Sequence, residues 1–286
     1  MIKPSTFSIV AYDSQTESWG IAIASKFLAV GSVVPWLSSN AGAIATQSYA
    51  NTLFGIDGIK LLTTGISAEG CFKEISKSDQ DLDLRQVGIV DKFGGSFTFT
   101  GKQCHDWAGG IAQPGYAIQG NLLASQNVIL EMEKAYLASE GDLADKLYAA
   151  LKAGDLAGGD KRGRQSAALR IVKTGAGYGG FSDNLIDFRV DNEADPIGKL
   201  ADMMELRHLY YDHSPMEEKI PIDETLIRNL TPLLIRKGHL SIVNFNRNEF
   251  LQALSDFIGY ENFEDRFDPI NQTLDKPVYE YILRTY

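Results

Sequence analysis

The residue with the clearest chemical potential near the start of the chain is Thr6, which opens the alternating stretch TFSIVAYD. A threonine hydroxyl is a weak nucleophile until a base removes its proton, and the free α-amine of the same residue can serve because its pKa is about 8. The next alternating stretch ends at Ser25 and Lys26, and a nearby lysine would lower the pKa of that amine by like-charge repulsion. This pattern predicts a threonine nucleophile with Lys26 tuning its base. The alternative is a strand threonine selected only for its β propensity.

A second candidate group lies in the stretch AIQGNLL, which carries Gln119 and Asn121 at the end of a predicted strand. Alternate positions of a strand point to one face, so both carboxamides would lie on the same side. A carboxamide can donate to a developing oxyanion, a role worth about 3 kcal/mol in hydrolases. We therefore predict Asn121 as an oxyanion donor. Ordinary turn chemistry before a helix is the alternative for Gly120 and Asn121.

The stretch AGGDKRGRQSAAL concentrates charged and polar side chains between glycines. The forked guanidinium of Arg162 could bind a carboxylate there, while the glycines let a ligand approach the backbone closely. The spacing differs from that of a nucleotide-binding P-loop. The stretch predicts an anion-binding loop, and a solvated connection is the alternative.

The remaining titratable residues give weaker patterns. The run DFRVDNEADP, from Asp187 to Pro196, could hold a hard cation, but such a run more often caps the following helix. No histidine pair has zinc-ligand spacing, and Cys104 and His105 are neighbours only along the chain. We predict no metal and no cofactor.

The elements that would position these residues follow from periodicity. Alternation predicts strands at 6–12, 19–25, 41–47, 85–91, 96–100, 116–119, 166–173 and 185–190. Helical periodicity predicts two helices in 57–79 and two in 126–153. Paired helices between antiparallel hairpins favour an α+β fold with two stacked sheets covered by helices, a four-layer αββα sandwich.

The last part of the chain differs in composition from the rest. Asp195 and Pro196 begin a helix that continues to Tyr211, and the polar stretch DHSPMEEKIPIDE follows it. We predict a domain boundary near residue 215, with the main domain at 1–214 and a small, mostly helical extension at 215–286.

Composition excludes several classes of protein. The formal net charge of −10 and the absence of a basic run argue against a nucleic-acid partner. The opening MIKPSTFSIV lacks the regions of a secretory signal, and no stretch reaches the roughly 18 apolar residues of a membrane span. Two cysteines are too few for a disulfide framework. These features predict a cytoplasmic protein with a small-molecule substrate and no membrane partner.

Several linked stretches give the chain a family resemblance: TFSIVAYD, GIAIASKFLAVGSVVPW, GAIATQSYAN, RQVGIVD, AIQGNLL, AGGDKRGRQSAAL and DFRVDNEADP. From Thr6 to about Leu206 it resembles the Ntn-hydrolase-like domain of unknown function 1028. The resemblance implies the αββα fold and, by analogy of fold, hydrolysis of linear amide bonds with Thr6, Lys26 and Asn121 as catalytic residues. The same stretches carry the residues that we expect to bind a small, anionic substrate: Ser25, Gln47, Gln119, Asp160, Arg162 and Gln165.

Ntn hydrolases use a nucleophile at a free N-terminus, and five residues precede Thr6 in this sequence. Activity of this kind therefore requires cleavage of the Ser5–Thr6 bond. The C-terminal part, through ENFEDR, is loosely similar to a peptidoglycan-binding-like extension of some family members. Many proteins of this fold associate, so we expect a homo-oligomer. The alternative to the hydrolase is a non-catalytic protein that retains the fold to bind a small metabolite or to assemble.

Overall fold

The computed structural model describes residues 6–212, 214–241 and 244–286. Contacts divide the chain into two compact units, Met1–Asp202 and Met203–Tyr286. The division falls inside helix α5 (Pro196–Tyr211), because Leu209 in the second half of this helix is buried in the same cluster as Ile222 and Leu226. The boundary expected near residue 215 stays a prediction.

Unit 1 contains two antiparallel sheets. The larger one has the strand order β10-β9-β2-β1-β8-β7. Its strands are β1 (Thr6–Asp13), β2 (Ser18–Ser25), β7 (Gly109–Gln113), β8 (Tyr116–Asn121), β9 (Ser166–Lys173) and β10 (Asn184–Val190). The smaller one has the order β3-β4-β5-β6. Its strands are β3 (Pro35–Ser38), β4 (Gly42–Ser48), β5 (Arg85–Asp91) and β6 (Ser96–Thr100).

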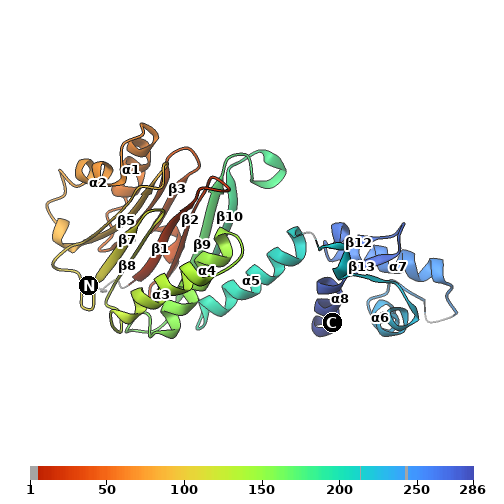
Figure 1. Ribbon diagram of the computed structural model, residues 1–286. Helices are drawn as coiled ribbons and strands as arrows, with labels where there is room; N and C mark the ends of the chain where they lie inside the picture. Colours follow the sequence, from red (N-terminus) through yellow and green to blue (C-terminus); the bar gives the residue numbers. More distant parts are fainter. Residues whose placement is uncertain (1–5, 213, 242–243) are drawn as a thin grey trace. The chain divides into compact units, whose positions relative to one another are not determined.

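Four helices cover the outer faces of these sheets. Helices α1 (Leu53–Thr63) and α2 (Ala68–Ile75) pack on the smaller sheet, and α3 (Asn127–Ala138) and α4 (Leu143–Leu156) pack on the larger one, as Figure 1 shows. The helix starts follow the capping chemistry of the sequence, since Ser67 and Asp142 accept hydrogen bonds from the first turns of α2 and α4. The predicted αββα sandwich is confirmed.

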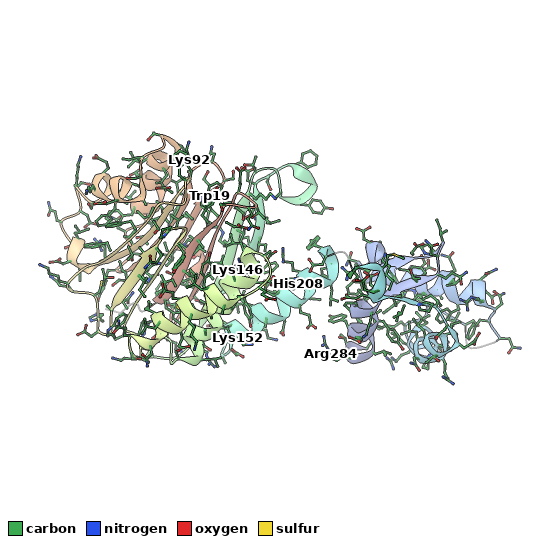
Figure 2. All side chains as sticks on the ribbon, in the orientation of Figure 1. Trp19, Lys92, Lys146, Lys152, His208 and Arg284 are labelled. Atoms are coloured by element: carbon green, nitrogen blue, oxygen red, sulfur yellow. The ribbon has the colours of Figure 1, made fainter. Side chains whose placement is uncertain are left out.

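An apolar cluster fills much of the space between the two sheets. Its buried members are Val10, Trp19, Ile21, Ile23, Val30, Val34, Ala43, Ala45, Val90, Ala168 and Val172. Trp19, labelled in Figure 2, stacks on Tyr12 with ring centroids 4.7 Å apart. Strand alternation sends the other face of β2 toward the helices, where a Cβ added to Gly20 would meet Leu147 of α4 at 2.4 Å. Strand β2 is therefore buried on both faces.

The two strands of unit 1 that the sequence did not reveal, β3 and β7, are both at sheet edges. Pro35 opens β3, because a proline without an N–H is tolerated at an edge. Gly109 and Gly110 remove the apolar alternation from β7. Neither strand changes the layers of the sandwich.

Unit 2 is mostly helical, as expected. It consists of the second part of α5, α6 (Glu224–Arg236), α7 (Arg247–Tyr260), α8 (Lys276–Thr285) and a small sheet of β11 (Lys219–Pro221), β13 (Thr273–Asp275) and β12 (Phe267–Asp268). The helices share one apolar cluster that includes Leu230, Phe250 and Phe257. A buried ion pair joins Arg266 Nε to Asp275 Oδ2 at 2.8 Å. Within the described ranges, no helix of the chain is both long and apolar enough to span a bilayer.

Candidate functional site

Thr6 is the first residue of β1 and lies at one end of the larger sheet. Its side chain is 3% exposed, and its Oγ1 donates to Ser25 Oγ at 3.3 Å. In the strand register Thr6 pairs with Asn121 of β8, while Ser25 of β2 pairs with Ser166 of β9. Antiparallel pairing thus brings the ends of four strands together around the threonine hydroxyl.

A buried network of amides and hydroxyls continues from Thr6 along the space between the sheets. Ser8 Oγ donates to Gln47 Oε1 and accepts from Gln119 Nε2, both at 2.7 Å. Gln86 Oε1 accepts from Gln47 Nε2 at 2.8 Å and from Asn121 Nδ2 at 2.9 Å. These bonds link β1 and β8 of the larger sheet to β4 and β5 of the smaller one. Gln47, Gln119 and Asn121, predicted as separate candidates, therefore belong to one cluster.

Gln86 is the member that the sequence analysis missed. Its Nε2 donates to the Gly120 carbonyl oxygen at 2.7 Å and to Thr100 Oγ1 at 2.9 Å, so its Oε1 must face Gln47 and Asn121. The amino group of Asn121 is consequently turned toward Gln86. The sequence did contain a signal for Gln86. In the predicted strand RQVGIVD it lies on the same face as Gly88 and Val90, and that face is buried between the two sheets.

Gly88 explains how the network fits between the sheets. A Cβ built on this residue of β5 would lie 2.1 Å from Gln119 Oε1 and 2.4 Å from its Cδ. Any larger residue would displace the Gln119 carboxamide from Ser8. The glycine is therefore required for the close approach of β5 to a side chain of the opposite sheet.

A cavity of about 380 Å³ adjoins this network, and Thr6 is one of its walls. Its polar side is formed by Thr6, Gln47, Ser48, Tyr49 and Arg85, and its apolar side by Phe27, Val30, Val33, Val34 and Ala50. The volume is in the range of small-ligand pockets, about 300 to 1,000 Å³. The nucleophile candidate is therefore beside space that could hold a small molecule.

Arg85, also absent from the predicted site, is held rigidly in that wall. Its Nε donates to Asp79 Oδ2 at 2.9 Å and its Nη1 donates to the Tyr49 carbonyl oxygen at 2.7 Å. The hydrogen bond from Arg85 lowers the pKa of Asp79 to about 2. The cavity thus borders a fixed ion pair.

The glycine-rich loop is organised around the buried carboxylate of Asp160. Its oxygens accept from the Lys26 backbone N–H at 2.7 Å, the Arg162 backbone N–H at 2.8 Å and Arg162 Nη2 at 2.9 Å. Asp160 therefore fastens the end of β2 to the loop, and the guanidinium of Arg162 neutralises it. The binding of a substrate carboxylate by Arg162 stays a prediction.

Two other predicted site residues point into the loop region. Lys26 Nζ donates to the Arg164 carbonyl oxygen at 3.0 Å in an exposed position. Gln165 Nε2 donates to Asn192 Oδ1 at 3.1 Å. Both line a separate cavity with Arg164 and Asn192, whereas Thr6 lines the cavity described above. The structure thus groups Thr6, Ser25, Gln47, Gln119 and Asn121. It places Asp160, Arg162 and Gln165 in the adjoining loop, and Lys26, at the end of β2, is bonded to that loop.

Comparison with known proteins extends this description. A family model described as "Family of unknown function (DUF1028)" matches residues 6–200, which include every residue of the site. The chain belongs to the DUF1028 family. A crystal structure titled as a DUF1028 protein from Silicibacter pomeroyi is 28% identical, with a TM-score of 0.65, and the match covers 71% of this chain and 89% of that one.

Outside the DUF1028 region, a second family model, described as "Putative peptidoglycan binding domain", matches residues 216–282. A search of curated proteins gave no match to this chain. The predicted family resemblances are thus confirmed for both parts of the chain. Neither description names a reaction or a substrate.

The other titratable candidates in the DUF1028 region have structural partners. Burial raises the pKa of the Cys104 thiol, which donates to the Arg85 carbonyl oxygen at 3.3 Å and is not poised to ionise. Asp187 pairs with Arg170 and Arg189. Asp195 accepts from the Gly198 N–H in the first turn of α5. Among the described residues, no group of three His, Cys, Asp or Glu side chains could hold a metal ion.

Proposed function

We propose that this DUF1028 protein is an Ntn-type amidohydrolase in which Thr6 is the nucleophile after cleavage of the Ser5–Thr6 bond. The observation that carries the proposal is the position of Thr6, whose hydroxyl is bonded to Ser25 Oγ at the edge of a cavity and beside a buried amide network. Ser5 lies outside the described residues, so support comes from Thr6 and the groups around it.

The chemistry proceeds in two steps. The freed α-amine of Thr6 takes the proton of Oγ1, which attacks the amide carbonyl carbon of the substrate. Asn121 pairs with Thr6 in the strand register and its amino group is oriented by Gln86, so we assign it as the donor to the developing oxyanion. The amine of the substrate leaves with a proton from the Thr6 ammonium, and water then hydrolyses the ester on Oγ1 to release the acid.

Lys26 has a smaller role in this proposal than the sequence suggests. Its ammonium donates to the Arg164 carbonyl oxygen, whereas its backbone N–H is bonded to Asp160. We assign it to holding the end of β2, next to Ser25, in place. The base is then the Thr6 amine alone, whose ordinary pKa of about 8 already suits neutral pH.

Intact-mass measurement of the purified protein before and after long incubation tests the proposal. We expect a species lacking the first five residues, and amide hydrolysis that grows with it. Thr6→Ala should abolish both, while Thr63→Ala, an exposed threonine of α1, should leave both unchanged. Hydrolysis that persists in Thr6→Ala without any loss of mass would show that another group is the nucleophile.

The uncleaved chain favours a second candidate, a protein that binds a small metabolite without converting it. Five residues precede Thr6, and with them in place the amine of Thr6 is part of a peptide bond and cannot act as a base. A thermal-shift screen of the uncleaved protein separates the two functions. A ligand that raises the melting temperature and is recovered unchanged supports binding alone.

A further inference from the structure

The apolar wall of the Thr6 cavity is a fixed structure. It is formed by the segment after β2, with Phe27, Val30, Val33 and Val34 facing the space. The Val30 N–H donates to Ser166 Oγ at 3.0 Å, and the Val34 carbonyl oxygen accepts from the Thr46 N–H at 3.1 Å. The wall is therefore bonded to β9 of the larger sheet and to β4 of the smaller one. A preformed wall of this kind loses little conformational entropy when a ligand binds.

The charge around the cavity is already compensated. Of the side chains that line it among the described residues, Arg85 alone carries a formal charge. Asp79 neutralises that charge through two hydrogen bonds, from Arg85 Nε at 2.9 Å and from Nη2 at 3.2 Å. The side chain of Asp79 is 4% exposed and that of Arg85 is 15% exposed, so the pair is largely buried but the guanidinium keeps some contact with solvent. An additional anionic group in the cavity would lie near this neutral pair and against five apolar side chains.

The position of the nucleophile decides which part of an amide would occupy the cavity. When Thr6 Oγ1 attacks, the acyl group becomes bonded to it, while the amine departs. Thr6 is itself a wall of the cavity, so the acyl group lies within reach of Phe27 and Val33. Building on the proposed function, we infer that the substrate is an amide with an uncharged, apolar acyl group, bound against the Phe27–Val34 wall. This differs from the anionic substrate that the sequence suggests.

A series of 4-nitroanilides tests this inference on the full chain after its mass has been checked. The acyl groups are acetyl, butyryl, hexanoyl and the carboxylate-ended succinyl. We expect kcat/KM to rise about fourfold for each methylene added until the cavity is filled. The hexanoyl compound should be cleaved at least tenfold faster than the succinyl compound.

Two lysine substitutions on the same segment provide the matched control. Val33→Lys adds a cation inside the cavity, and Leu28→Lys adds one outside it, since Leu28 is 58% exposed and does not line the cavity. We expect Val33→Lys to reverse the preference toward the succinyl compound by at least tenfold and Leu28→Lys to leave it unchanged. The isosteric Val33→Thr, which is gentler on the fold, should lower the hexanoyl preference several-fold.

Calorimetry of hexanamide binding to the Thr6→Ala variant shows whether the inferred apolar site or the proposed hydrolase has failed. Cleavage that requires Thr6 but is faster with succinyl overturns the apolar acyl group and leaves the nucleophile in place. Binding of hexanamide that Val33→Lys abolishes, without any cleavage by the native chain, supports the apolar site and overturns the hydrolase. If hexanamide does not bind and the hexanoyl 4-nitroanilide is not cleaved, the apolar site is wrong.

Discussion

The space between the two sheets of unit 1 is filled in two different ways along its length. Toward one end, Val10, Ile21 and Val90 belong to an apolar cluster. Toward the other, the same faces of the same strands carry polar side chains, with Ser8 on β1 and Gln86 on β5. One sandwich thus contains a dry half and a hydrogen-bonded half.

The two halves differ in what they require of the fold. Each buried valine or isoleucine contributes roughly 1.5 to 3 kcal/mol wherever it packs. A buried amide contributes about 1 kcal/mol net when paired, and an unpaired one costs about 1 to 3 kcal/mol. The polar half therefore contributes less to the stability of the fold and is more sensitive to the loss of a hydrogen-bond partner. This half lies beside Thr6 and the cavity, where the proposed reaction needs fixed donors and acceptors.

The largest expected effect comes from removing the centre of the polar half. Gln86→Leu leaves Gln47, Asn121 and the Gly120 carbonyl oxygen each without one buried hydrogen bond. We expect it to lower the free energy of unfolding by about 4 kcal/mol. Urea unfolding followed by tryptophan fluorescence measures this in unit 1, which contains all three tryptophans, Trp19, Trp36 and Trp107.

The control for this change is Gln80→Leu, at an exposed glutamine outside the sheets, which should change stability by less than about 0.5 kcal/mol. Equal effects of the two substitutions would show that the network has no structural role. The comparison between a dry and a hydrogen-bonded half would then fail.

Gly88→Ala tests the same half through its geometry. The added Cβ would overlap the Gln119 carboxamide, and moving that group breaks its bonds to Ser8. We expect a loss of about 3 kcal/mol in the free energy of unfolding. The matched measurement is a double-mutant cycle with Gln119→Ala, in which Gly88→Ala should cost much less. Strict additivity of the two changes would mean that the glycine matters for another reason.

The fold of unit 1 follows largely from alternation and capping. The stretches TFSIVAYD and RQVGIVD coincide with β1 and β5, and Ser67 and Asp142 cap the helices that they precede. The edge strands β3 and β7 were missed because their residues lose the alternating signal. Pro35 opens one and Gly109 opens the other, and an edge tolerates both residues.

The grouping of the candidate site residues was predictable only where the strand pattern itself carried polar residues. Gln119 and Asn121 stood out as alternate amides, and the structure groups them with Thr6. The partners of Lys26 and Arg162 come from long-range contacts that no local pattern encodes, since Asp160 is 134 residues from Lys26 in the chain. Gln86 was missed because its role depends on its hydrogen-bond partners in other strands, and the sequence of its own strand does not reveal them.

Introducing a hydroxyl into the dry half tests whether that half lacks hydrogen-bond partners. Val10→Thr conserves the side-chain shape but puts a polar group at a position with 0% exposure among apolar neighbours. We expect it to lower the free energy of unfolding by about 2 kcal/mol. Val10→Ala, measured in the same way, gives the cost of lost packing alone. If Val10→Thr left the protein as stable as the native chain, the dry half would contain a partner for the hydroxyl, and the contrast would disappear.

The smallest effect concerns the ion pair at the rim of the polar half and depends on pH. Arg85 holds the pKa of Asp79 at about 2, below the ordinary value of 3.8, so the pair stabilises the fold above about pH 4 and loses this contribution as the pH falls toward about 2. We expect about 1 to 2 kcal/mol, since Arg85 is 15% exposed and solvent screens the pair. Stability curves for the native protein and Asp79→Asn should converge over this interval, because only the native protein has the carboxylate to protonate. Curves that stay parallel would show that the pair contributes nothing to unit 1, and that the polar half relies on its neutral amides alone.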